Sequence, residues 1–138
     1  MPDRINHLAV WVAAIVYYLF GSLWYAVFAV TWHALANLSP AAPVGAASYI
    51  GSFITGLILA YATAMALTRR AEDQTVPQGV SFALFMGIAL YASQTFNQVL
   101  FGTRPFALWL IDTGYVVVGF AIVGAIVGGW KKRRVVAA

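Results

Sequence analysis

Four long apolar runs dominate the chain, and three short breaks separate them. The runs cover residues 8–32, 46–68, 79–101 and 106–130, so each reaches the roughly 20 residues that a helix needs to cross a bilayer. Hydrophobic residues make up 62% of the chain and charged residues 9%, and the charges fall almost entirely in the breaks and at the ends. The pattern therefore predicts a single all-α membrane domain over residues 1–138 rather than a soluble fold.

The positive charges predict how this domain is oriented. Arg4 precedes the first run, Arg69 and Arg70 lie in the second break, and Arg104 is alone in the third. The tail, residues 131–138, opens with four basic residues, Lys131, Lys132, Arg133 and Arg134. Because Lys and Arg concentrate in cytoplasmic loops, we expect both termini in the cytoplasm and an up-down-up-down bundle of four helices. We also expect the tail to bind anionic lipid headgroups and not nucleic acid, since no soluble fold presents it.

The breaks contain residues that favour helix ends. Thr75 can cap the third helix, and Pro77 then lies in its first turn. In the third break, Gly102 suits the left-handed position after a helix, and Pro105 suits the first turn of the next one. The sequence thus predicts a tight hairpin between the last two helices.

Small residues recur at helical spacing on two runs and predict where helices pack closely. The second run carries Ser48, Ser52, Gly56, Ala60 and Ala64, and the last run carries Gly114, Ala121, Gly124, Ala125 and Gly128. The glycine face of the last run lies roughly opposite the face that bears Asp112. One face is expected to meet helices of the same chain. The glycine face then meets either a second copy, which gives a homodimer, or another helix of the same chain.

Polar residues inside the apolar runs are the candidates for a functional site, because each costs free energy unless it is paired or hydrated. At ~1.5 Å rise per residue, six of them fall about 22 to 28 Å from the cytoplasmic ends, with Ser52 near the same level. They are Trp24, Tyr25, Gln94, Asn97, Gln98 and Asp112. Tyr91 shares a helix face with the three amides, and Tyr115 lies one turn beyond Asp112. The hairpin is expected to bring these two faces together.

Asp112 is the one charged residue within the runs. Arg104 can reach back over the hairpin to keep its carboxylate ionised, and we expect Gln94 or Asn97 to donate amide hydrogen bonds to it. The pair is open to two interpretations, a ligand or ion site and a purely structural clamp between the last helix and the loop before it.

Catalytic and metal-binding patterns are not found in the sequence. The chain has no Cys, and His7 and His33 would be about 39 Å apart on a continuous helix, too far to share a metal. No metalloprotease, nucleophile-elbow or phosphate-loop motif occurs. We therefore expect no catalytic residue, no metal, no cofactor and no enzymatic activity.

Several segments resemble the bacterial family called Domain of Unknown Function 1761 along essentially the whole chain. They are 21–25, 101–105, 110–115 and 124–130. The resemblance implies a small four-helix protein of the bacterial inner membrane, and it implies no activity. The sequence departs from the family by having Ala26 and Val27 where Ser and Pro are expected, which removes a possible kink in the first helix.

Two functions remain after these exclusions. The first is binding or conduction of a small solute or cation at an outward-facing polar recess centred on Asp112, lined by Arg104, Gln94, Asn97, Tyr115 and Trp24. The second is an accessory or scaffold subunit that docks a larger membrane complex or lipids and transports nothing.

Overall fold

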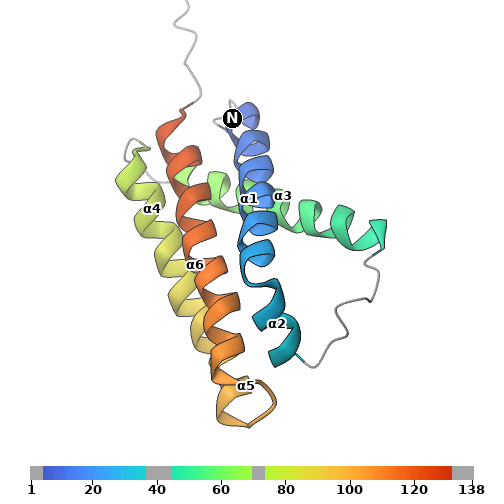
Figure 1. The fold of residues 1–138 in the computed structure, drawn as a ribbon. Helices are drawn as coiled ribbons and strands as arrows, with labels where there is room; N and C mark the ends of the chain where they lie inside the picture. The colour runs from blue at the N-terminus through green and yellow to red at the C-terminus, as the bar shows by residue number, and fades with distance from the viewer. Residues whose placement is uncertain (1–4, 37–44, 70–73, 132–138) are drawn as a thin grey trace, which may run out of the picture.

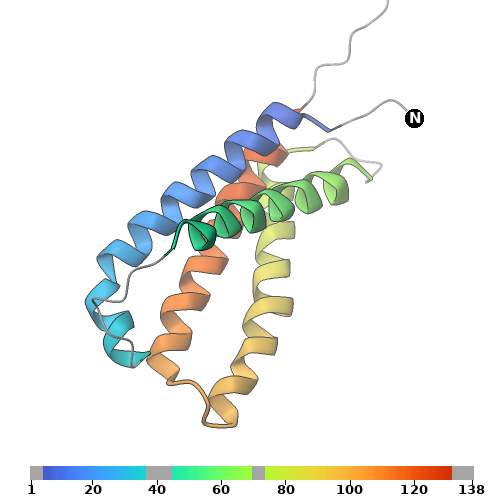
Figure 2. The same ribbon diagram turned by 90° about the vertical axis from the view of Figure 1, so that its right-hand side faces the viewer.

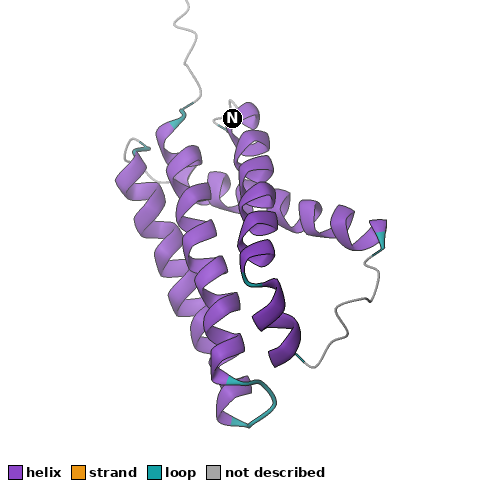
Figure 3. Ribbon diagram, in the orientation of Figure 1, coloured by secondary structure: helices purple, strands orange, loops and turns teal. Residues whose placement is uncertain are grey.

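The protein consists of helices joined by short loops, without a strand, over the residues that its computed structural model describes, which are 5–36, 45–69 and 74–131 (Figure 3). The elements are α1 (His7–Val27), α2 (Ala29–Leu35), α3 (Ala46–Thr68), α4 (Val76–Phe85), η1 (Met86–Ala92), α5 (Ser93–Leu100) and α6 (Phe106–Gly129). Helices α4, η1 and α5 follow one another without a break, so four helices are long and apolar enough to span a membrane. The all-α fold with four spans is as the hydropathy pattern predicts.

Side chains and backbone geometry account for several helix ends. The Asn6 side chain accepts a hydrogen bond from the Ala9 N–H at 3.2 Å, which caps α1. Thr75 accepts from the Gln78 N–H at 3.3 Å and caps α4 as predicted. Gly102 has a φ of 71°, the left-handed conformation that the hairpin between α5 and α6 requires. The last two spans are therefore joined by a tight turn.

The first span is bent, although the sequence predicts one helix over 8–32. Helix α1 ends at Val27, and Phe28, with φ −96° and ψ 9°, separates it from α2. Main-chain hydrogen bonds continue through the bend, because the Phe28 N–H donates to Trp24 and the Trp32 N–H donates to Phe28. The bend thus forms without the proline expected of the family, and it leaves α2 in contact with α6.

The third span also departs from a regular α-helix. It begins at Val76 rather than 79 and contains the π-helical segment η1 over Met86–Ala92. The segment contains no proline, and its one glycine, Gly87, does not by itself predict a π-helical turn. π-Helical turns in α-helices often occur at functional sites.

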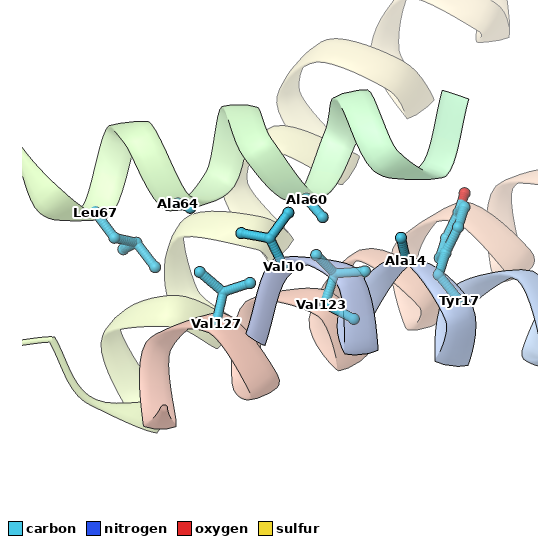
Figure 4. Close-up of a cluster of buried hydrophobic side chains, with 9 residues drawn as sticks. Val10, Ala14, Tyr17, Ala60, Ala64, Leu67, Val123 and Val127 are labelled. Carbon is cyan, nitrogen blue, oxygen red and sulfur yellow. The ribbon is translucent and has the colours of Figure 1, made fainter. Parts of the chain in front are cut away.

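Helix α6 lies in the middle of the molecule, between α1 on one side and α4 on the other (Figure 1). Helix α3 crosses this layer at a steep angle, and its first half extends beyond the other helices (Figure 1); Figure 2 shows α3 crossing in front of α6. Only the second half of α3 has buried residues, from Gly56 onwards. Where α1, α3 and α6 meet, small side chains and branched aliphatic side chains form the core (Figure 4), which includes Val10, Ala14, Ala60, Ala64, Leu67, Val123 and Val127.

The closest helix contact joins α4 to α6 through glycines. A Cβ atom placed on Gly124 would lie 2.2 Å from the carbonyl oxygen of Gly79, and one placed on Gly128 would lie 2.4 Å from that of Thr75. The glycine face of α6 therefore packs against α4 in the same chain. Of the two alternatives for this face, the structure has the one within a single chain, so a homodimer through Gly124 and Gly128 is not the arrangement observed.

The other predicted packing residues have different environments. Gly56 faces the ring of Tyr17, and Gly114 faces Trp24. Ala121 is half-buried, whereas Ser52 is exposed and its hydroxyl donates to the Ser48 carbonyl at 2.8 Å. Ser52 does not pack against another helix of the same chain, because the tilt of α3 carries its first half away from α1 and α6 (Figure 1), and a role for Ser52 in an oligomer stays a prediction.

Candidate functional site

The carboxylate of Asp112 is buried in α6, with only 7% of the residue exposed. Its Oδ1 atom accepts two hydrogen bonds from neutral donors on the first span. The Tyr25 hydroxyl donates at 2.6 Å and the Trp32 indole N–H donates at 3.0 Å. Because Tyr25 belongs to α1 and Trp32 to α2, these bonds connect both parts of the bent span to α6.

The second carboxylate oxygen, Oδ2, forms an ion pair with the guanidinium of Arg104. Among the described residues, Arg104 is the only hydrogen-bond partner of this oxygen. The Arg104 side chain is 31% exposed and belongs to the loop between α5 and α6, where its main-chain N–H donates to the Gln98 carbonyl at 3.1 Å. The approach of Arg104 to Asp112 that the short hairpin predicts is therefore present.

The amides of the third span do not take part in this cluster. Gln94, Asn97 and Gln98 are exposed, and no hydrogen bond within the described residues joins any of them to Asp112. The prediction that Gln94 or Asn97 donates to the carboxylate is wrong. The reason is the order of the helices, since α6 lies between the third span and the first, and Asp112 faces the first.

A different set of residues on α5 faces α6. The Trp109 indole N–H donates to the Thr95 hydroxyl at 3.0 Å, and the rings of Phe96 and Trp109 meet edge-on with centroids 5.0 Å apart. Helix α5 therefore presents Thr95 and Phe96 to α6 and directs its amides elsewhere.

Three tyrosine rings, those of Tyr17, Tyr25 and Tyr115, pack against one another next to the carboxylate of Asp112. The ring of Tyr115 lies 5.2 Å from that of Tyr25 and 5.1 Å from that of Tyr17, measured between centroids. Gly21 allows this approach, because a Cβ there would lie 2.9 Å from the Tyr115 hydroxyl oxygen. Tyr115 is thus next to the site as predicted, through its contact with Tyr25.

Two other predicted lining residues have mainly structural contacts. The Trp24 indole N–H donates to the main-chain carbonyl of Ile111 at 3.0 Å, so Trp24 ties α1 to the residue before Asp112. Tyr91 is half-buried in η1, and its carbonyl accepts from the Thr95 hydroxyl at 2.7 Å.

The sequence analysis did not identify Tyr25 and Trp32 as donors to the carboxylate. They are seven residues apart, so they lie on one face of the first span, two turns from each other. That spacing, together with the depth of Tyr25, could have indicated a shared partner on another helix. The spacing does not predict the bend at Phe28, which lies between Tyr25 and Trp32.

Neither a metal site nor a cluster of basic residues lies in the part of the chain that the structure describes. Within residues 5–36, 45–69 and 74–131, no three His, Cys, Asp or Glu side chains are grouped as a metal site would require. Of the basic residues expected to bind lipid headgroups, Lys131 is exposed, and Lys132, Arg133 and Arg134 lie outside the described residues.

The fold and the site together define a multi-pass α-helical membrane protein with a buried Asp–Arg pair between its first and last spans. Comparison with family models shows more specifically that the chain belongs to the family described as "Protein of unknown function (DUF1761)", which matches residues 8–128. No curated protein matches the chain, and no solved structure matches it.

Proposed function

We propose that the protein binds a small organic cation at Asp112 and moves it across or into the membrane. The observation that carries this proposal is the unequal environment of the two carboxylate oxygens. Oδ1 is held by two neutral donors, Tyr25 and Trp32, whereas Oδ2 faces only the guanidinium of a loop residue. The first oxygen orients the carboxylate, and the second is the position where cations can exchange.

Arg104 indicates the chemistry of the cation. Its guanidinium is itself a planar organic cation, and it occupies the position that an ammonium or guanidinium ligand would take. Tyr25 and Trp32 donate to the other oxygen of the same carboxylate, and their rings meet edge-on with centroids 6.1 Å apart. Aromatic rings at a site attract organic cations that reach their faces. In the proposed cycle, an incoming cation displaces Arg104, and Arg104 returns when the cation leaves.

The loop position of Arg104 supports exchange. The residue lies between α5 and α6, next to Gly102, and about a third of its side chain is exposed. Its guanidinium can therefore be rehydrated when it leaves Asp112, which lowers the cost of separating the pair.

We further propose that the protein resides in a bacterial inner membrane with both termini in the cytoplasm, so that its four spans run alternately outwards and inwards. The support is the distribution of Lys and Arg, with Arg69 on one side and Arg104 alone on the other. The Asp112 site is then on the outer side of the membrane.

A second candidate function is that of an accessory or scaffold subunit. The observation that favours it is that both oxygens of the carboxylate have partners and that Asp112 is buried. In that case the only role of Asp112 is structural: its hydrogen bonds hold the first span against α6, and its ion pair with Arg104 holds the loop there.

The variant Arg104→Ala tests whether the carboxylate of Asp112 accepts an organic cation in place of Arg104. Removal of the guanidinium leaves a buried carboxylate without its counter-ion, which is expected to lower stability by about 3 kcal/mol. If the site accepts organic cations, millimolar methylguanidinium should raise the thermal midpoint of this variant much more than that of the wild type, since a ligand that binds the folded state stabilises it. Thermal unfolding in detergent, followed by tryptophan fluorescence, measures both effects.

Sodium chloride at the same ionic strength and the double variant Arg104→Ala/Asp112→Asn are the controls. Neither sodium chloride added to Arg104→Ala nor methylguanidinium added to the double variant should raise the thermal midpoint in the same way. If the destabilised Arg104→Ala protein responds to methylguanidinium no more than to sodium, the pair is a clamp and the scaffold function is favoured. A proteoliposome assay of methylguanidinium uptake then tests whether binding leads to transport.

A further inference from the structure

Three side-chain amides of α5 form an exposed surface, and two of them have no hydrogen-bond partner among the described residues. Gln94, Asn97 and Gln98 are all exposed, and we call these three side chains the amide face. Gln94 donates to the neighbouring Ser93 hydroxyl at 3.4 Å, while no side-chain hydrogen bond of Asn97 or Gln98 is formed within the described residues. The amide face is therefore available for contacts outside the chain.

The position of the amide face makes contact with lipid tails unfavourable. All three residues belong to the third span, Val76–Leu100, and Gln94, Asn97 and Gln98 precede its end by six, three and two residues, or about 9, 4.5 and 3 Å at ~1.5 Å per residue. A side-chain amide that faces lipid tails costs free energy unless it finds a hydrogen-bond partner, and this cost is largest for Gln94, the deepest of the three. Helix α6 cannot supply one, because it contacts α5 through Thr95 and Phe96 instead.

We propose that the amide face is the interface between two copies of this chain. A primary amide has both donors and an acceptor, so three uncharged amides on one helix are complementary to the same three on a second copy. A two-fold axis near Asn97 pairs the faces symmetrically, which is the arrangement of most homodimers. The face bears no charge that would select a charged partner.

The structure also excludes the other predicted surface for this role. The glycine face of α6, with Gly124 and Gly128, is already in contact with α4. The third span is at the edge of the layer, on the side of α6 away from α1, so a second copy can approach α5 without displacing a helix (Figures 1 and 2). The proposal is independent of what Asp112 binds.

Disulfide trapping can test this interface because the chain contains no Cys. We expect oxidation in native-like lipid to convert Gln94→Cys, Asn97→Cys or Gln98→Cys to a covalent dimer. The matched control is Ile58→Cys on α3, which is 63% exposed but lies away from the amide face. Cross-linking at the amide face that does not exceed that of Ile58→Cys would overturn the proposal.

The mass of the protein in lipid nanodiscs provides a second measurement. The wild type is expected to be a dimer, and the triple variant Gln94→Leu/Asn97→Leu/Gln98→Leu a monomer with unchanged helix content, because these side chains contact little of their own chain. A monomeric wild type would overturn the proposal and would mean that the amides are hydrated at the membrane surface. A complex with a different protein in place of a second copy would overturn it too.

Discussion

Replacement of Gly124 by alanine is expected to separate α4 from α6 and to destabilise the protein severely. The added Cβ would lie 2.2 Å from the Gly79 carbonyl oxygen and 2.8 Å from the Ala83 Cβ. The first of these atoms belongs to a helix backbone, so the clash cannot be relieved by a side-chain rotation. Forced overpacking of this kind costs about 3 kcal/mol or more when the two helices must move apart. The measurement is the thermal midpoint in detergent, together with the fraction of protein that remains monodisperse.

Two other glycines serve as matched controls. A Cβ on Gly87 would lie 3.5 Å from the Val117 Cα, an ordinary contact, in the same pair of spans. Gly51 on α3 has no atom within 4 Å of its added Cβ, so Gly51→Ala should be neutral or stabilising by up to ~1 kcal/mol through helix propensity. A Gly124→Ala protein as stable as these two controls would mean that α4 and α6 are farther apart than described.

Much of the fold could be predicted because span length and hydropathy depend on local composition. The runs 46–68 and 106–130 differ from α3 and α6 by at most one residue at either end. The bend at Phe28 and the π-helical segment Met86–Ala92 contain no proline that would predict them. Both α2 and the π-helical segment contact α6, and hydropathy within a single run does not specify such contacts.

The site was predictable only where its residues are close in sequence. Arg104 and Asp112 are joined by a short hairpin, so their approach follows from local geometry. The choice between Gln94 and Tyr25 as a partner depends on which span α6 turns its carboxylate towards. Gln94 and Tyr25 lie at a depth in the membrane similar to that of Asp112, so depth alone does not show which of them is its partner. The partner depends on which helix packs against the face of α6 that bears Asp112.

The variant Asp112→Asn is expected to abolish binding of organic cations while the protein stays folded. Asparagine keeps an oxygen that can accept from Tyr25 and Trp32, so the bent first span should remain attached to α6. Arg104 loses its partner but is 31% exposed and can turn to water, so the expected loss of stability is only about 1 to 2 kcal/mol. Loss of the charge removes roughly 3 kcal/mol of binding free energy, or ~100-fold in affinity for methylguanidinium, so binding at millimolar concentration should no longer be detected. Isothermal titration of the purified protein in nanodiscs measures this affinity.

The control for this prediction is Tyr25→Phe, which removes one hydrogen bond to Oδ1 and keeps the carboxylate. Its affinity should fall less than that of Asp112→Asn, since the phenol bonds the carboxylate and not the ligand, and the charge that attracts the cation remains. A larger loss in Tyr25→Phe than in Asp112→Asn would show that the phenol, and not the charge, recognises the ligand. Unchanged binding in Asp112→Asn would place the ligand elsewhere in the protein and leave the Asp112–Arg104 pair with a structural role, because only a site that uses the carboxylate loses affinity when its charge is removed.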